Sequence, residues 1–192
     1  MSADVHHAAW RFAWALALCA LGCGRARAPS SPVDLHGVAV DPLAAPGRAT
    51  VLVFVTTECP ISNRYAPEVQ RLYERFGKLG VKFFLVYPSH LDSVSEITAH
   101  LAQHEYTIPA LRDPDGVLVK RAGALRTPEA AVFGSNRVLA YSGRIDDRFV
   151  DFGQERLAPG SHDLEDALNA VLRGQAVSPS RRDAVGCTIV QR

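Results

Sequence analysis

The stretch VLVFVTTECPISNRYAPE, residues 51–68, decides the fold. Its first half is a run of β-branched and aromatic residues, as expected for a strand buried on both faces. Its second half begins a helix, with Pro60 in the first turn, where a missing N–H costs no hydrogen bond. Cys59 lies between them, where free N–H groups and the positive end of a helix dipole favour the reactive thiolate. The position also allows burial as a small apolar side chain.

Outward from this stretch, strands and helices alternate. A helical face of apolar residues follows Cys59, and then come a second buried strand (81–88), a helix with a Ser-x-x-Glu capping box (93–106), an Asp-Pro-Asp-Gly turn (113–116), a hairpin (128–143) and a capped helix (161–174). The order β-α-β-α-(α)-β-β-α predicts an α/β fold. Its first half should have parallel strands joined by right-handed crossovers.

The two ends of the chain predict attached segments. Residues 12–22, FAWALALCALG, are uncharged and apolar but too short to span a bilayer comfortably, as in a secretory signal. Either the chain is cleaved after residues 26–28 (ARA), or ALGC resembles a bacterial lipobox and Cys23 is lipidated, or the segment remains as an anchor. We expect a signal or lipoprotein segment (1–23), a tether (24–34), a domain (35–174) and a flexible C-terminal tail (175–192). Each option is extracytoplasmic, where disulfides persist.

Charge and cysteine spacing exclude several classes of function. The net charge is +1, which favours no nucleic-acid partner. The four cysteines form no C-x-x-C pair, so the spacing matches neither a zinc site nor a haem attachment site. No cofactor and no metal are expected.

Two prolines add to the pattern around Cys59. Pro67 lies eight positions later inside a helical pattern, and Thr127-Pro128 precedes a strand, where proline is normally avoided. Together these residues resemble the thioredoxin superfamily over roughly residues 33–173. The resemblance implies a three-layer sandwich with a central mixed sheet, helices on both faces, and a cis bond at Thr127-Pro128 facing the sulfur. The long strands and the extracytoplasmic address look most similar to the redoxin, alkyl-hydroperoxide-reductase and TlpA-like branch.

The resemblance implies thiol-based redox chemistry at Cys59, which would attack a disulfide or a peroxide. Thr127, Pro128 and Pro60 would then lie along the substrate, since backbone next to a cis-proline can pair with an extended peptide. The chain departs from the family in one respect: the motif is Cys59-Pro60-Ile61-Ser62, with Ser62 where thioredoxins have a second cysteine. A serine cannot form a disulfide, but its hydroxyl can hydrogen-bond the thiolate and lower the pKa further.

Cys187 is the candidate for the missing resolving thiol. It lies in a short apolar island, AVGCTI, within the C-terminal tail, and a mobile tail can swing over the active-site face. A disulfide with another protein and an unpaired thiol are the alternatives.

The sequence leaves peroxide and disulfide substrates open. The peroxiredoxin signature is half met, because Thr56-x-x-Cys59 fits but Leu52 stands where that family has proline. Arg64 and Arg144 are the candidates for a peroxide-binding arginine, or they are surface arginines.

A long loop, residues 143–160, separates the last predicted strand from the last helix. Loops of this length are usually functional or form a docking surface, and its aspartates could bind a hard cation or form salt bridges.

The predicted function is an extracytoplasmic thiol-based oxidoreductase. Its partners are a protein thiol or disulfide, or a peroxide, and the membrane through a lipid anchor or signal segment. The alternative is a non-catalytic module of the same fold that binds a metal such as copper or another protein.

Overall fold

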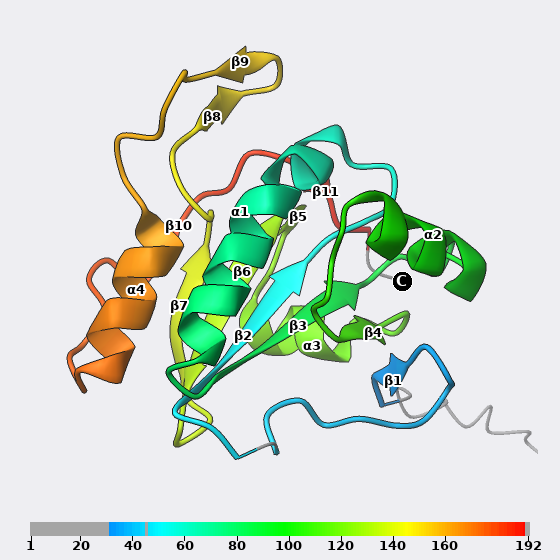
Figure 1. Cartoon of the computed structure of the whole chain (residues 1–192), viewed down its shortest axis with the longest axis horizontal. Helices are drawn as coiled ribbons and strands as arrows, with labels where there is room; N and C mark the ends of the chain where they lie inside the picture. Colours follow the sequence, from blue (N-terminus) through cyan, green and yellow to red (C-terminus); the bar gives the residue numbers. More distant parts are fainter. Residues whose placement is uncertain (1–30, 45, 191–192) are drawn as a thin grey trace, which may run out of the picture.

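In the computed structural model, the described residues are 31–44 and 46–190 (Figure 1). The expected signal segment, Cys23 and most of the expected tether lie outside them. The helices are α1 (Pro60–Gly77), α2 (Val94–Gln103), α3 (Val117–Ala122) and α4 (Asp163–Leu172). The strands are β1 (Val33–Asp34), β2 (Ala49–Phe54), β3 (Val81–Tyr87), β4 (Ala110–Arg112), β5 (Arg126–Thr127), β6 (Glu129–Gly134), β7 (Leu139–Gly143), β8 (Phe149–Asp151), β9 (Gln154–Glu155), β10 (Arg181–Arg182) and β11 (Cys187–Thr188).

One mixed sheet organises the fold, in the order β1-β4-β3-β2-β6-β7-β10. Strand β2 runs parallel to β3 and antiparallel to β6, and β3 runs parallel to β4. The predicted parallel first half and the predicted hairpin of β6 and β7 are therefore confirmed. All six residues of β2 are buried, as its uninterrupted apolar run predicts for a central strand.

Helices cover both faces of this sheet, so the expected three-layer sandwich is confirmed (Figure 1). Alternate residues of β2 point to opposite sides. Val51 and Val53 pack in one core cluster with α1 and α4, and Leu52 and Phe54 pack in a second cluster with α3. The strand that leads to Cys59 therefore packs against an apolar cluster on each face, which fixes the position of the backbone before the sulfur.

Two short strands lie in the segment that the sequence describes as a flexible tail. Strand β10 adds to the sheet edge in parallel with β7, and β11 pairs antiparallel with β5. The apolar island supplies the reason, because Val185 and Cys187 pack against the first core cluster and Ile189 packs against the second. Among residues 31–44 and 46–190, none of the helices combines the length and apolar character that crossing a bilayer requires.

Candidate functional site

Cys59 occupies the N-cap position of α1, with extended backbone angles (φ −76°, ψ 110°). Pro60 takes the first helical position, and the carbonyl oxygen of Cys59 accepts the N–H of Asn63 at 3.0 Å. The sulfur therefore lies at the positive end of an 18-residue helix, where a thiolate is stabilised.

The Thr127–Pro128 bond is cis and faces this sulfur, as the resemblance implied. The Cys59 sulfur lies 2.9 Å from the carbonyl oxygen of Thr127, and the hydroxyls of Thr56 and Thr127 are 3.4 Å apart. The start of α1 and the loop before β6 therefore form the two sides of one small site.

The C-terminal tail covers the site. Cys187 pairs with Thr127 across β11 and β5, which brings its thiol next to the Cys59 sulfur. Both cysteines are free thiols in this structure. Under this cover Cys59 is only 1% exposed, so a reagent as large as a protein reaches it only after the tail moves.

Opposing effects act on the pKa of Cys59. Burial raises it, whereas hydrogen bonds from the Cys187 thiol and from the side chain and backbone N–H of Ser62 lower it, and the net pKa lies below that of an ordinary cysteine. The Ser62 hydroxyl is buried and has no hydrogen-bond partner of normal geometry, so it is available to donate to the sulfur once the thiolate forms. The Thr127 carbonyl oxygen, in contrast, can only accept a hydrogen bond. It accepts one from the Cys59 thiol and so stabilises the protonated form.

The pKa of Cys187 is shifted in the opposite direction, to about 11. Burial raises it, and the hydrogen bond to Cys59 and the charge on Cys59 raise it further. Of the two thiols, Cys59 is therefore the one that ionises first and the better nucleophile near neutral pH.

Glu129 is a residue of the site that the sequence analysis missed. Its carboxylate is 2% exposed, and it accepts the backbone N–H groups of Leu125 and Arg126 at 2.8 and 3.1 Å. The same carboxylate accepts Arg181 from β10 at 3.3 Å. Glu129 thus connects the strand that faces Cys59 with the anchor of the tail. A charged residue directly after a proline in an otherwise apolar strand was the only sequence signal for it.

A buried polar network supports the other side of the site. The Asn63 side-chain amide donates to the Thr57 carbonyl at 3.1 Å, and its oxygen lies 2.8 Å from Nε2 of His100. Nδ1 of His100 lies 2.9 Å from the Tyr87 hydroxyl. Neutral His100 satisfies every partner, since Nε2–H donates to Asn63 and Nδ1 accepts from Tyr87.

Acid is expected to destabilise the protein through His100. Burial, and then the neighbouring His104, lower its pKa from 6.5 to about 4. Between these values the unfolded chain binds more protons than the folded one, so stability falls as the pH drops from about 6.5 towards 4. We expect His100 to contribute a loss of about 2 kcal/mol between pH 7.5 and pH 5 in urea unfolding. If the free energy of unfolding of His100→Gln fell equally steeply between pH 7.5 and pH 5, this assignment would be contradicted.

The described residues offer no cluster of three histidine, cysteine, aspartate or glutamate side chains that could hold a metal. His100 and His104, one helical turn apart on α2, have ring centroids 4.6 Å apart, but both nitrogens of His100 already have partners.

The arginines that the sequence offered for peroxide are held elsewhere. Arg64 forms an ion pair with Glu155, and Arg144 forms one with Asp163 at 2.8 Å. Neither guanidinium is among the groups that influence the Cys59 sulfur.

The long loop between β7 and α4 forms the β8–β9 hairpin, which projects beyond the sandwich near the start of α1 (Figure 1). Its aspartates have structural partners: Asp146 accepts the Tyr65 hydroxyl, and Asp147 accepts the backbone N–H groups of residues 160 and 161. Phe149 is buried, whereas Phe152 is exposed.

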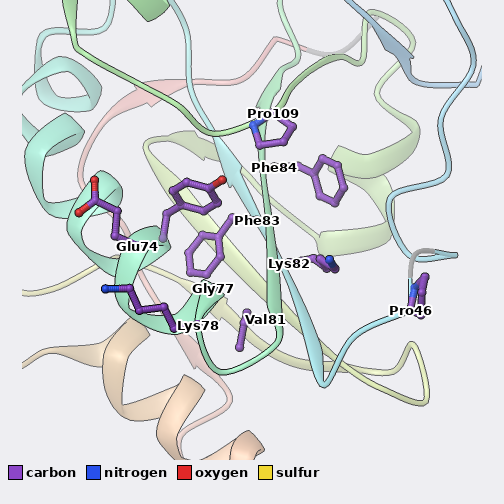
Figure 2. Close-up of a pocket in the computed structure, with 10 residues that line it drawn as sticks. Pro46, Glu74, Gly77, Lys78, Val81, Lys82, Phe83, Phe84 and Pro109 are labelled. Carbon is purple, nitrogen blue, oxygen red and sulfur yellow. The ribbon is translucent and has the colours of Figure 1, made fainter.

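A large groove lies away from both cysteines. It measures about 810 Å³ and is formed by the end of α1, strand β3 and the approach to β4 (Figure 2). Tyr73, Phe83 and Phe84 give it an apolar lining, and Lys78 and Lys82 lie along it. No cysteine, serine, threonine or histidine among the described residues lines it, so the candidate site is the covered one at Cys59.

Comparisons with known proteins agree with this geometry. The family model described as Redoxin matches residues 25–151. A search of curated proteins found no significant match.

Many solved structures have a similar fold, and three bacterial proteins are examples. An uncharacterised conserved protein from Geobacillus kaustophilus has a TM-score of 0.73 at 22% identity, over 86% of this chain and 89% of that one. A putative thiol:disulfide interchange protein DsbE from Chlorobium tepidum has a TM-score of 0.57 at 16% identity, over 76% of this chain and 94% of that one. The pneumococcal exposed lipoprotein thioredoxin of Streptococcus pneumoniae has a TM-score of 0.53 at 17% identity, over 77% of this chain and 99% of that one. At these identities the likeness establishes a thioredoxin-like fold.

Proposed function

Because the chain belongs to the redoxin family, we propose that it is an extracytoplasmic thiol–disulfide oxidoreductase with Cys59 as nucleophile and Cys187 as resolving thiol. One observation carries the proposal: Cys187 pairs with Thr127, whose carbonyl oxygen lies 2.9 Å from the Cys59 sulfur, so the two thiols come together beside the cis-Thr127–Pro128 bond. Two thiols with pKa values shifted in opposite directions form an asymmetric pair, suited to attack by one and resolution by the other.

In the first step the Cys59 thiolate attacks one sulfur of a substrate disulfide. A Cys59–substrate disulfide forms as the substrate S–S bond breaks, and the leaving thiolate takes a proton from solvent. Ser62 stabilises the attacking thiolate by hydrogen bonding, and Pro60 starts the helix whose free N–H groups favour it. Thr127 and Pro128 provide the backbone edge along which the substrate lies.

In the second step Cys187 attacks the Cys59 sulfur and releases the second substrate thiol. Two electrons have then passed from the two protein thiols to the substrate, and an external thiol reduces the new Cys59–Cys187 disulfide. Once Cys59 is in a disulfide it has no charge, so two of the three causes that raise the pKa of Cys187 disappear. The resolving thiol therefore ionises more readily when it is needed.

A disulfide is the better candidate substrate than a peroxide. The tail is an extended polypeptide paired with β5 beside Cys59, which is how a protein substrate would lie. The two candidate arginines for peroxide are engaged with Glu155 and Asp163.

The proposed location is the cell envelope, through lipidation of Cys23 or cleavage of the signal segment. Support comes from the apolar N-terminal stretch and from the printed descriptions of similar folds, one of which is an exposed lipoprotein. Disulfide exchange as a function suits that compartment.

Replacing Cys187 with serine tests the proposal. Reduced wild-type protein mixed with one equivalent of a small disulfide should end as a Cys59–Cys187 disulfide, identified by mass spectrometry. Cys187→Ser should stop at the mixed disulfide on Cys59, and its release of the second substrate thiol within this single turnover should be at least about a hundredfold slower than that of the wild type.

Val190→Ala, in the same tail but with an exposed side chain, is the matched control and should behave like the wild type. Release of the second substrate thiol at the wild-type rate by Cys187→Ser would reject the resolving role, and wild-type thiols that do not react with the disulfide would favour a non-catalytic binding module.

A further inference from the structure

The tail segment 184–190 lies on β5 as a bound peptide would. Cys187 is paired with Thr127 and Thr188 with Arg126 in antiparallel register, and the Ile189 N–H donates to the Leu125 carbonyl at 3.0 Å. Main-chain pairing of this kind binds an extended chain largely independently of its side chains. Selectivity must therefore come from the places where side chains or close backbone contacts intervene.

Gly186 is the closest such contact. A Cβ atom at this position would lie 2.1 Å from the carbonyl oxygen of Thr127 and 2.7 Å from its carbonyl carbon. Both atoms belong to the backbone that faces Cys59, so they cannot rotate aside as a flexible side chain would. The residue directly before the seated cysteine must therefore be glycine, and the requirement comes from space alone.

Arg126 contacts the seated chain on both sides of the cysteine. Its Nη1 lies 3.2 Å from the Gly186 carbonyl oxygen and 3.3 Å from the Thr188 hydroxyl. The carboxylate of Glu129 accepts the backbone N–H of Arg126, which helps to hold that residue in place. A segment with glycine before cysteine and a hydroxyl residue after it satisfies these contacts.

We propose that β5 is a docking edge for an extended peptide with glycine directly before cysteine, and that the tail is a built-in occupant which an external protein of this pattern displaces. The inference deepens the proposed function, because it defines the substrate class of the same site. It also accounts for the burial of Cys59, which becomes accessible only when the tail leaves.

The tail can leave the site while it stays attached to the fold. Arg181 and Arg182 hold β10 through Glu129 and Asp163, each at 3.3 Å. Beyond them Asp183 is exposed and the remaining tail residues are half-buried or exposed, apart from Gly186. Release of residues 184–190 breaks the pairing with β5 and the packing of Val185, Cys187 and Ile189 but leaves β10 in place, so it is a local opening. When the tail returns it displaces the partner chain and brings Cys187 back to Cys59.

The first test measures access to Cys59 in the full-length protein. Cys187→Ser serves as background, and iodoacetamide alkylation of Cys59 is followed by mass spectrometry. Adding Gly186→Ala should speed alkylation at least about tenfold, because the added methyl group prevents seating of the tail. Gly77→Ala is the matched control, since a Cβ there meets nothing within 4 Å, and it should leave the rate unchanged. Equal rates in the three proteins would overturn the covering role.

The second test measures selection with two synthetic peptides on the Gly186→Ala/Cys187→Ser protein. Ala-Val-Gly-Ser-Thr-Ile-Val copies residues 184–190 with serine for cysteine, so it cannot react. It should slow alkylation of Cys59 at least about fivefold, whereas the same peptide with alanine in place of glycine should give no protection. Equal protection by both peptides, or protection by neither, would overturn the proposed selection.

A loss of folding in Gly186→Ala would show in circular dichroism. In that case Arg126→Gln in the same Cys187→Ser background provides the second route to an open site, with the same expected acceleration and the same contradiction if the rate is unchanged. None of these measurements involves turnover. They would succeed even if Cys59 and Cys187 proved inactive with disulfides, so failure of this inference and failure of the proposed function are distinguishable.

Discussion

Replacing Cys59 with serine is expected to lower the rate of disulfide reduction at least about a thousandfold, because a hydroxyl near neutral pH cannot supply the thiolate that attacks sulfur. The helix start, Ser62 and the cis-proline loop would all remain, but they act through the sulfur. The remaining Cys187 is a poor substitute, since burial still raises the pKa of its thiol and it lies in β11 rather than at a helix start. The measurement is the reduction of a small disulfide by the pre-reduced protein under single-turnover conditions.

The matched control for this variant is Ser62→Ala, which keeps the sulfur and removes one donor to it. We expect Ser62→Ala to slow the reaction about tenfold or less and to move its pH dependence upward, since the pKa of Cys59 loses one stabilising hydrogen bond. A Cys59→Ser protein that reacts within about tenfold of the wild-type rate would show that another thiol is the nucleophile.

Replacing Leu52 with alanine is expected to lower the free energy of unfolding by about 2–5 kcal/mol. Leu52 lies in β2 at the centre of the sheet, is fully buried, and packs in the cluster under α3. Removing its side chain leaves a cavity that strands on both sides prevent from closing. Urea unfolding followed by circular dichroism measures the change.

Leu157→Ala is the control for Leu52→Ala. The substitution removes the same atoms, but from a fully exposed side chain near the β8–β9 hairpin. Its effect should stay within about 0.5 kcal/mol. Similar effects for both variants would contradict the assignment of Leu52 to the core. The prediction concerns function as well, since β2 leads directly to Cys59 and loosening it should also loosen the site.

Much of the fold could be predicted from short-range pattern. The buried run before Cys59, the capping box at Ser93 and the hairpin after Pro128 all appear where the sequence indicated them. Each of these features depends on residues a few positions apart, through periodic burial, capping or turn chemistry. The cis bond at Thr127-Pro128 was expected on the resemblance to a family and is present.

The site was only partly accessible to the same reasoning. The position of Cys59 at a helix start was predicted, and the tail was expected to reach the active-site face. Its pairing with β5 and the burial of Cys59 beneath it were not predicted, because the tail has no periodic pattern and the pairing joins residues about 60 positions apart. Glu129 and Gly186 were missed for the same reason. A carboxylate that holds Arg126 and Arg181, and a glycine pressed against the Thr127 carbonyl, have no local signature.

The sequence by itself determined the order of strands and helices and the place of one cysteine at the end of a central strand, since backbone preference and burial period act within a few residues. Only the tertiary structure decided that the second cysteine lies against the first, that a glycine lets the two backbones approach, and that Cys59 is covered. Those outcomes depend on the close contact of distant segments, which the packing of the whole sheet brings to one edge.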